Sequence, residues 1–294
     1  MDGSRKQRVL HAAAGLLALT GATHARADEP LFGYVNTTDL LPKGKFQIEQ
    51  WLTAREGGGP GRYQRLEGRS AVEYGLRDDL QLTAYLNYSR LRAELDRTGA
   101  EAAGVLPAPP TARSGVDGVT GEAIWRVASP YLSPIGIALL VDATVGRERP
   151  VFGFKAIAQK NMLDDTLVFA GNARLDLGQV DLQPQRNGPS PRRRDVSRLE
   201  FDLGASYRFR ANWSAALELR YRKRYAGGRL QDTAAFFGPS LHYGGQRWFF
   251  TLSALRRLHD AHRSQPAGEL SDSLTYLAER TEWDGLRLRV GRTF

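Results

Sequence analysis

The chain has 294 residues, a formal net charge of +9 and no cysteine. The absence of cysteine excludes a disulfide-stapled secreted domain, a thiolate metal site and a cysteine nucleophile. The longest apolar run after residue 27 covers only residues 135–141, far short of the roughly 20 residues of a membrane-spanning helix. The length suits one large β domain or two ordinary ones.

Residues 1–27 have the order of features typical of a cleaved secretory signal peptide. Three basic residues among the first eight precede a short apolar core at 9–19, and Ala25-Arg26-Ala27 supplies a small-x-small cleavage pattern. We therefore expect export, with a mature chain that begins at Asp28. Because export separates the chain from nucleic acid and its basic residues are scattered, we expect no nucleic-acid partner.

Residues 28–44 show no clear period and end in Leu41-Pro42-Lys43-Gly44, a turn-like stretch. The segment is predicted to be a periplasmic N-terminal lead-in or a plug in a lumen. The remainder, residues 45–294, repeats one local pattern and is predicted to form a single domain.

That pattern is the alternation of apolar and polar residues, which is typical of strands with two different faces. It is clearest in residues 199–221, where Leu199 and Phe201 alternate with Glu200 and Asp202 before a turn at 210–212. About twelve strands are predicted, in chain order at 46–53, 65–74, 80–89, 119–126, 135–145, 154–159, 167–176, 199–209, 213–221, 237–243, 248–254 and 286–290.

The predicted connections alternate between short turns and longer loops. Loops are expected at 56–61, 92–118, 178–196, 222–232 and 258–282, the last with a short helix at 274–280. Aromatic residues flank the short turns and form a candidate girdle: Tyr74, Trp125, Phe209, Trp213, Tyr243 and Trp248. Outer-membrane barrels combine short periplasmic turns, long outer loops and such girdles.

These features favour an all-β fold, a transmembrane antiparallel up-and-down β-barrel of about twelve strands. A soluble β-sandwich would show the same local alternation. It would leave the signal peptide, the loop asymmetry and the aromatic girdle unexplained. We expect a location in the Gram-negative outer membrane, with both termini in the periplasm.

Four stretches resemble an uncharacterised family of Gram-negative outer-membrane β-barrel, porin-like proteins. They are FGYVNTTDLLPKGKFQIEQWLTAREG (32–57), EYGLRDDLQLTAYLNY (73–88), QKNMLDDTLVFAGN (159–172) and GPSLHYGGQRWFFTLSAL (238–255). The resemblance implies the fold and no particular reaction. The terminal Phe294 also resembles the C-terminal signal that the barrel assembly machinery reads, although Arg292 departs from its pattern.

If the apolar faces meet lipid, the polar faces line the lumen. Charged residues predicted there are Glu49, Arg65, Glu67, Arg69, Glu73, Glu122, Arg126, Asp142, Lys155, Arg174, Asp176, Glu200, Asp202, Arg208, Glu218, Arg220, Arg287 and Arg289. With Lys45, Arg55 and Arg222 added, twelve basic groups face nine acidic ones. Charged rings of this kind can select solutes.

We expect a porin-like passive channel for small polar or anionic solutes, with no cofactor and no metal. A closed structural or surface-binding barrel is the main alternative. A third is a lipid-modifying enzyme that uses Ser240 and His242, although the known lipase families carry the reverse order, His-x-Ser. Expected partners are outer-membrane lipid, lipopolysaccharide, whose phosphates Arg192-Arg193-Arg194 could meet, and the barrel assembly machinery.

Overall fold

The computed structural model describes residues 30–59, 61–95, 111–146, 150–182, 192–262 and 282–294. The predicted signal peptide and the predicted short helix at 274–280 lie outside these residues. Within the described ranges, no helix is long and apolar enough to cross a membrane.

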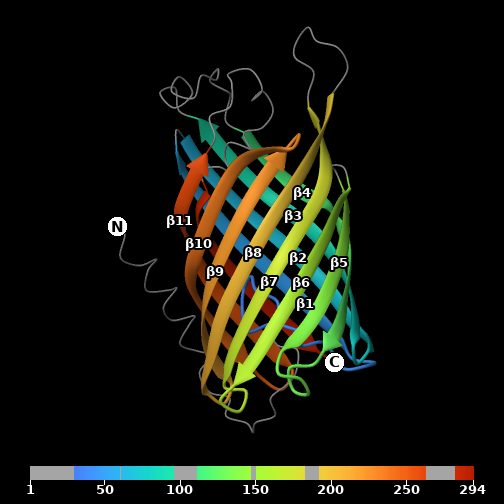
Figure 1. Cartoon of the computed structure of the whole chain (residues 1–294). Helices are drawn as coiled ribbons and strands as arrows, with labels where there is room; N and C mark the ends of the chain where they lie inside the picture. The colour runs from blue at the N-terminus through green and yellow to red at the C-terminus, as the bar shows by residue number, and fades with distance from the viewer. Residues whose placement is uncertain (1–29, 60, 96–110, 147–149, 183–191, 263–281) are drawn as a thin grey trace, which may run out of the picture.

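The described strands close into one antiparallel barrel in which each strand pairs with its neighbours in sequence and β1 pairs with β12 (Figure 1). The prediction of an all-β barrel of about twelve strands is therefore confirmed. The strands are β1 (Phe46–Gly59), β2 (Gly61–Arg77), β3 (Leu80–Leu95), β4 (Thr111–Ala128), β5 (Gly136–Gly146), β6 (Val151–Met162), β7 (Leu167–Leu182), β8 (Arg192–Arg210), β9 (Trp213–Ala226), β10 (Arg229–Gly244), β11 (Trp248–His262) and β12 (Glu282–Thr293).

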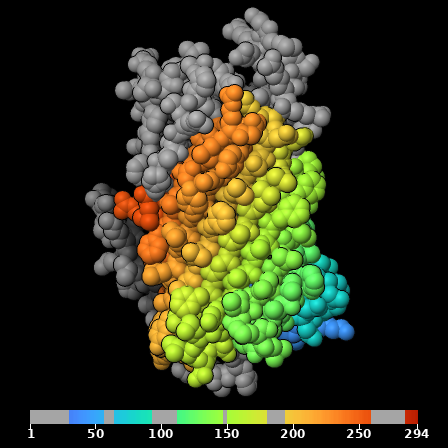
Figure 2. Space-filling model, in the orientation of Figure 1, coloured from blue at the N-terminus to red at the C-terminus, as the bar shows by residue number. Residues whose placement is uncertain are grey.

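The alternating sequence becomes alternating burial, because successive side chains of a strand point to opposite faces. On β5 and β6, Val141 and Phe154 are each 49% exposed, whereas Asp142 is 7% and Lys155 9% exposed. The strands pack side by side into a continuous outer wall (Figure 2). The barrel is thus apolar outside and charged inside, as expected for a barrel in a membrane.

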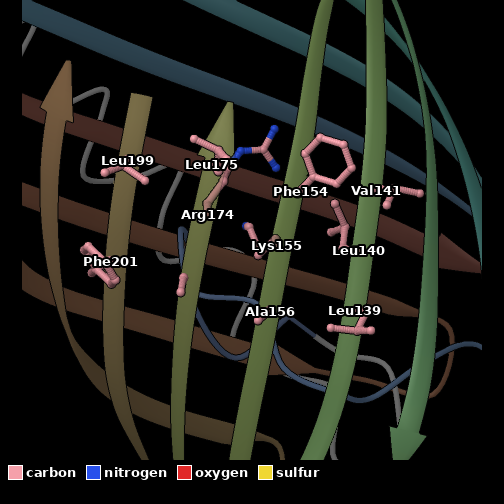
Figure 3. Close-up of a pocket in the computed structure, with 11 residues that line it drawn as sticks. Leu139, Leu140, Val141, Phe154, Lys155, Ala156, Arg174, Leu175, Leu199 and Phe201 are labelled. Carbon is pink, nitrogen blue, oxygen red and sulfur yellow. The ribbon is translucent and has the colours of Figure 1, made fainter. Parts of the chain in front are cut away.

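The outer wall over β5–β8 carries a shallow apolar groove of about 390 Å³ (Figure 3). Ala156 and Ala173 are paired in the β6–β7 ladder at the level of the groove, and larger residues such as Phe154 and Phe201 line it. In a membrane this surface faces acyl chains, which fill such hollows.

Several predicted loops are wrong, because the strands continue further than their apolar alternation does. β1 and β2 pair up to Gly59 and Gly61, so the strands continue into the loop predicted at 56–61. β9 and β10 are joined by Gly227-Gly228, both with positive φ, instead of a loop over 222–232. Backbone ladders need no apolar side chains once they leave the hydrocarbon, so polar sequence there misled the prediction.

The three remaining long loops are shortened in the same way. β11 continues to His262 and β12 begins at Glu282, which corrects the predicted loop 258–282. β3 ends at Leu95 and β4 begins at Thr111, which corrects the predicted loop 92–118. β7 ends at Leu182 and β8 begins at Arg192, which corrects the loop 178–196 and places Arg192-Arg193-Arg194 at the start of a strand. At the other end of the barrel, short turns join the strands, such as those at Asp78-Asp79 and Ala211-Asn212.

Residues 30–44, called here the lumen segment, run inside the barrel as far as Leu41 and are exposed at 42–44, before β1 begins (the blue coil in Figure 1). They have no strand assignment. Phe32 and Val35 pack against Ala170 and Ala216 of the wall. Leu40 packs with Ile124, Ala138, Leu140 and Ile157. The barrel therefore has small apolar cores in its lumen, and each of them includes residues of this segment.

Candidate functional site: the lumen and its N-terminal segment

A single carboxylate on β9 binds three consecutive backbone N–H groups of the lumen segment. Gly33 donates to Oε1 of Glu218 over 2.8 Å, and Tyr34 and Val35 donate to Oε2 over 2.7 and 3.1 Å. The Glu218 side chain is fully buried. Hydrogen bonds to an ionised acceptor are stronger than neutral ones, so Glu218 is the main anchor of the segment.

Two hydroxyl groups complete this anchor. Ser240 of β10 donates to Oε1 of Glu218, and Ser253 of β11 donates to the same oxygen over 3.1 Å. The two serine hydroxyls are also 2.6 Å apart. Five donors therefore converge on Glu218, three from the segment and two from the wall.

Glycine allows the segment to approach the wall this closely. A Cβ atom on Gly33 would lie 2.0 Å from Oγ of Ser253. A Cβ atom on Gly204 of β8 would lie 2.6 Å from the ring of Phe32. The ring of Phe32 therefore occupies the space that any larger residue at position 204 would need.

Neutral amides on β7, β6 and β3 hold the next residues. Asn172 of β7 accepts from the backbone N–H of Asn36 over 2.8 Å and donates to its carbonyl over 2.9 Å. Oε1 of Gln159 on β6 accepts from the backbone and the hydroxyl of Thr38. Gln81 of β3 accepts from the backbone of Leu41 over 2.8 Å. The segment is thus tied across the lumen rather than along one wall.

Two arginines of β12 bind the carbonyl groups of the segment. Arg287 donates to the carbonyl of Gly33 over 2.9 Å and lies 3.7 Å from the ring centre of Tyr34. Arg289 donates to the carbonyl of Phe32 and binds both oxygens of Glu49 on β1, over 2.7 and 3.0 Å. Strand β12 therefore holds the segment from the side opposite Asn172.

Ion pairs between neighbouring strands also line the lumen, beside the segment at Arg220, which lies 4.3 Å from the ring centre of Tyr34, and beyond it. Arg174 lies 2.8 Å from Asp142 and 2.7 Å from Asp176. Arg220 lies 2.8 Å from Glu200 and 3.4 Å from Asp202. Further pairs join Arg55 and Arg65 to Glu67, Arg198 to Asp176 and Arg224 to Asp232. Arginine predominates among the basic partners of this ladder.

The structure places all eighteen predicted lumen residues on inward-facing strand positions, and their contacts divide them into four groups. Glu218, Lys155, Arg220, Arg287 and Arg289 contact the segment, and nine others form or flank the ion-pair ladder. Arg126 and Arg208 lie at the turn end, where they donate to the carbonyls of Asp78 and Asp165. Glu73 accepts from Gln81, and Glu122 accepts from Tyr85.

The carboxyl group of Asp39 is held at the turn end of the lumen. Tyr131, in the turn between β4 and β5, donates to Oδ1 over 3.0 Å, and Gln159 donates to Oδ2 over 3.1 Å. Burial raises the pKa of Asp39 above its ordinary value, and the hydrogen bonds from Gln159 and Tyr131 only partly oppose this. Burial and the neighbouring Asp39 also raise the pKa of Tyr131.

Ser240 and His242 both face the lumen and both contribute to the contacts of the segment. The hydroxyl of Ser240 lies with Glu218 and Ser253. Nδ1 of His242 lies 2.8 Å from the hydroxyl of Thr251, which in turn donates to the carbonyl of Pro30. The acceptor beside the serine is therefore a carboxylate that already binds the segment.

The six predicted girdle residues lie at strand ends next to the short turns, and four of them are clearly exposed: Tyr74, Trp125, Phe209 and Trp248. Trp213 packs edge-on against Tyr243, with ring centres 5.0 Å apart. Phe294 stacks on Phe46 at 4.6 Å, and its N–H donates to the carbonyl of Phe46. This last pair joins the first strand to the last residue of the chain.

Sequence reasoning missed the residues that hold the segment through neutral groups, Asn172, Gln159, Gln81 and Ser253. Their signal was present: each is a polar residue at an inward position. The prediction of lumen residues rested on charge alone, so it left these neutral residues out. No group of three or more His, Asp or Glu side chains forms a metal-coordinating cluster in the part of the chain that the structure describes.

A closed twelve-strand barrel with an apolar outside, a charged inside and an internal N-terminal segment defines a transmembrane β-barrel of the outer-membrane type. The chain belongs to the family of unknown function DUF6662, whose model matches residues 24–294. No protein with a curated description matches it in sequence.

Solved outer-membrane barrels share the fold at low sequence identity. The COG4313 outer membrane channel from Pseudomonas putida F1 is 14% identical with a TM-score of 0.64, over 87% of this chain and 98% of that one. The β domain of the Bordetella autotransporter BrkA is 8% identical with a TM-score of 0.55, over 85% and 99%. The NanC porin is 12% identical with a TM-score of 0.52, over 83% and 98%.

Proposed function

We propose that the protein is an outer-membrane channel whose lumen is closed by its own N-terminal segment and which passes small polar or anionic solutes when that segment moves. The observation that carries this proposal is the way in which residues 30–44 are held. They cross the lumen and bind the wall mainly through single side chains, without strand pairing to it. Such contacts can break one by one while the ladders of the barrel stay intact.

Two further features support a channel. Beyond the segment, arginine and carboxylate side chains line the lumen, a surface that favours water and polar solutes over an apolar core. Two solved structures that share the fold are described as an outer-membrane channel and a porin. Insertion by the barrel assembly machinery, with Phe294 as its signal, is part of the proposal.

A closed structural barrel is the second candidate, and the anchor at Glu218 favours it. Five donors on one buried carboxylate fix the segment firmly. A lipid-modifying activity has less support, because Ser240 and His242 hold the segment. We expect Ser240→Ala to leave lipid hydrolysis at background.

Conductance in planar bilayers separates the channel from the closed barrel. We compare the parent with a variant that lacks residues 31–41 and with Glu218→Ala. If the segment closes the lumen, the deletion gives stepwise channels with at least severalfold higher conductance than the parent, because its buried groups no longer fill the lumen. Glu218→Ala removes one carboxylate and five hydrogen bonds, so we expect it to increase the frequency of opening.

Insertion has to be verified separately, through resistance of the folded barrel to unfolding in detergent at room temperature. Well-inserted deletion variants that remain silent would contradict the channel and favour the closed barrel. Equal, large conductance in the parent and the deletion variant would show that the segment does not close the lumen.

A further inference from the structure

Arg292 of β12 is a charged residue on the outer wall of the barrel, at the end where the short turns join the strands. The chain ends close to it, at the lower end of the barrel in Figure 1. Its cross-strand partners are Ile48 of β1 and Trp248 of β11, which are 49% and 54% exposed. Residues paired across neighbouring strands share a face of the sheet, so the side chain of Arg292 faces lipid and not the lumen.

Two aromatic rings hold the guanidinium group of Arg292. Its carbon Cζ lies 5.2 Å from the ring centre of Trp248 and 4.7 Å from that of Phe294, within the range of cation–π attraction. Phe294 is itself held, because its ring stacks on Phe46 and its N–H donates to the carbonyl of Phe46. Residues next to both neighbouring strands therefore fix the position of the guanidinium.

No acceptor in the described part of the chain satisfies this guanidinium. Nε of Arg292 is buried without a hydrogen-bond partner, and the residue makes no ion pair with another described residue. The side chain as a whole is only partly buried, so a group outside the barrel can reach it. A guanidinium has five N–H donors, accepts no hydrogen bond and stays charged. An anionic acceptor from outside the chain would complete its contacts.

Further basic residues lie on either side of Arg292. Arg247, in the turn before β11, is exposed, and its carbonyl accepts from the N–H of Thr293 over 2.9 Å. Lys45, directly before β1, is exposed as well. The surface around Arg292 is therefore positively charged and attracts anions.

Acidic residues do not cancel this charge on the outer wall. Residues 46–50, 248–252 and 289–293 contain one acidic residue, Glu49. Glu49 faces the lumen and binds Arg289 through both of its oxygens. The lipid-facing side of these three stretches thus carries a cation and no carboxylate side chain.

Trp248 indicates the depth of this site in a membrane. Tryptophan side chains gather at the membrane–water interface, and Trp248 is the first residue of its strand. Phospholipid phosphates lie at that interface, and long basic side chains on an apolar surface extend toward it. A planar guanidinium binds phosphate through paired hydrogen bonds. The surroundings of Arg292 therefore fit a lipid phosphate, with acyl chains against Ile48 and Val290.

We propose that Arg292, between Trp248 and Phe294, binds the phosphate of an anionic phospholipid where β12 pairs with β1. This pairing closes the barrel, so the bound lipid should stabilise closure. The site also gives a role to the residue that departs from the C-terminal assembly pattern. It goes beyond the proposed channel and does not depend on it, since a closed barrel would bind the same lipid.

The experiment uses the full mature chain, refolded in detergent without the assembly machinery, with dioleoyl phosphatidylglycerol as the probe. Native mass spectrometry counts the lipid molecules that the barrel retains during a titration. We expect Arg292→Leu, which restores the apolar residue of the assembly pattern, to weaken the tightest binding at least fivefold. The lipid should raise the unfolding temperature of the parent more than that of the variant. Inorganic phosphate should not displace the lipid, because it lacks the acyl chains.

The matched control is Arg229→Leu, which removes one exposed positive charge next to the turn between β9 and β10, at the other end of the barrel. It should bind the lipid like the parent. The proposal is overturned if Arg292→Leu, folded by resistance to detergent, binds like the parent, if both variants lose affinity equally, or if inorganic phosphate displaces the lipid.

Assembly in cells separates the lipid from the other partner that could recognise Arg292. If Arg292→Leu binds the lipid normally but is assembled less well, the residue serves the assembly machinery and the lipid site is wrong. Because no transport is measured, failure of the channel proposal would leave the lipid result intact.

Discussion

At the scale of single residues, Phe32 fits tightly against Gly204 in the lumen. The aromatic ring lies where a Cβ atom would be, and Phe32 is completely buried. A side chain at position 204 cannot be accommodated by moving the strand, because β8 is paired on both sides, to β7 and β9. The lumen segment has to move instead.

Gly204→Val should therefore displace the segment without removing any residue of it. We expect the frequency of channel opening to rise severalfold, measured in planar bilayers. Gly121→Val is the matched control, because a Cβ atom at Gly121 of β4 meets nothing within 4 Å. A Gly204→Val protein that conducts like both the parent and the control would show that Phe32 is not needed for closure.

At the scale of elements, the lumen segment and the turn between β4 and β5 are joined through Asp39 and Tyr131. Burial raises the pKa of Asp39 when the segment is in place. A raised pKa means that the seated segment holds the proton more tightly than the released one. Protonation of Asp39 therefore stabilises the segment in its place in the lumen. This stabilisation is complete below the pKa that Asp39 has when the segment is released, and it is lost as the pH rises through the pKa that Asp39 has when the segment is in place.

Acidification from pH 7 should thus favour the seated segment and reduce channel opening. Asp39→Asn, which imitates the neutral acid, should show fewer openings at pH 7 and a weaker dependence on pH. Asp164→Asn in an exposed turn serves as the control and should retain the parental dependence. More frequent opening of the parent at low pH, abolished by Asp39→Asn, would reverse the assigned sign.

The strands themselves could be predicted from sequence because lipid and lumen impose a period of two on every element. Val141 and Asp142, or Phe154 and Lys155, show it plainly. The extensions beyond the membrane could not be predicted, since Gly57 to Gly59 and Arg222 to Ala226 continue their ladders without that period. Nor could the seating of residues 30–44, which depends on neutral side chains such as Asn172 and Gln159 from distant strands.

At the scale of the whole molecule, basic and acidic groups are distributed unevenly along the lumen. Beside the segment, Asp39, Glu73 and Glu122 line a small polar cavity. Arginines face the carboxylates of the ion-pair ladder, Arg287 lies against Tyr34 of the segment, and Arg69 lies against Tyr85 of the wall. Removal of the segment removes Asp39 and leaves the arginines to determine the potential of the open lumen.

The variant lacking residues 31–41 should therefore prefer anions, with a chloride permeability exceeding that of potassium about two- to fivefold. The measurement is the reversal potential in a KCl gradient. Arg287→Gln on the same background should reduce this preference, because it removes a positive charge near the middle of the lumen. A potassium-selective deletion variant would mean that the carboxylates dominate.

The length of the strands has a consequence for the surroundings of the barrel. β8 has 19 residues, which at about 3.3 Å per residue and a tilt near 40° rise roughly 48 Å. The hydrocarbon layer is only about 25 Å tall at such barrels. Roughly 20 Å of β-sheet therefore extends beyond the hydrocarbon layer, which is more than the thickness of one head-group region.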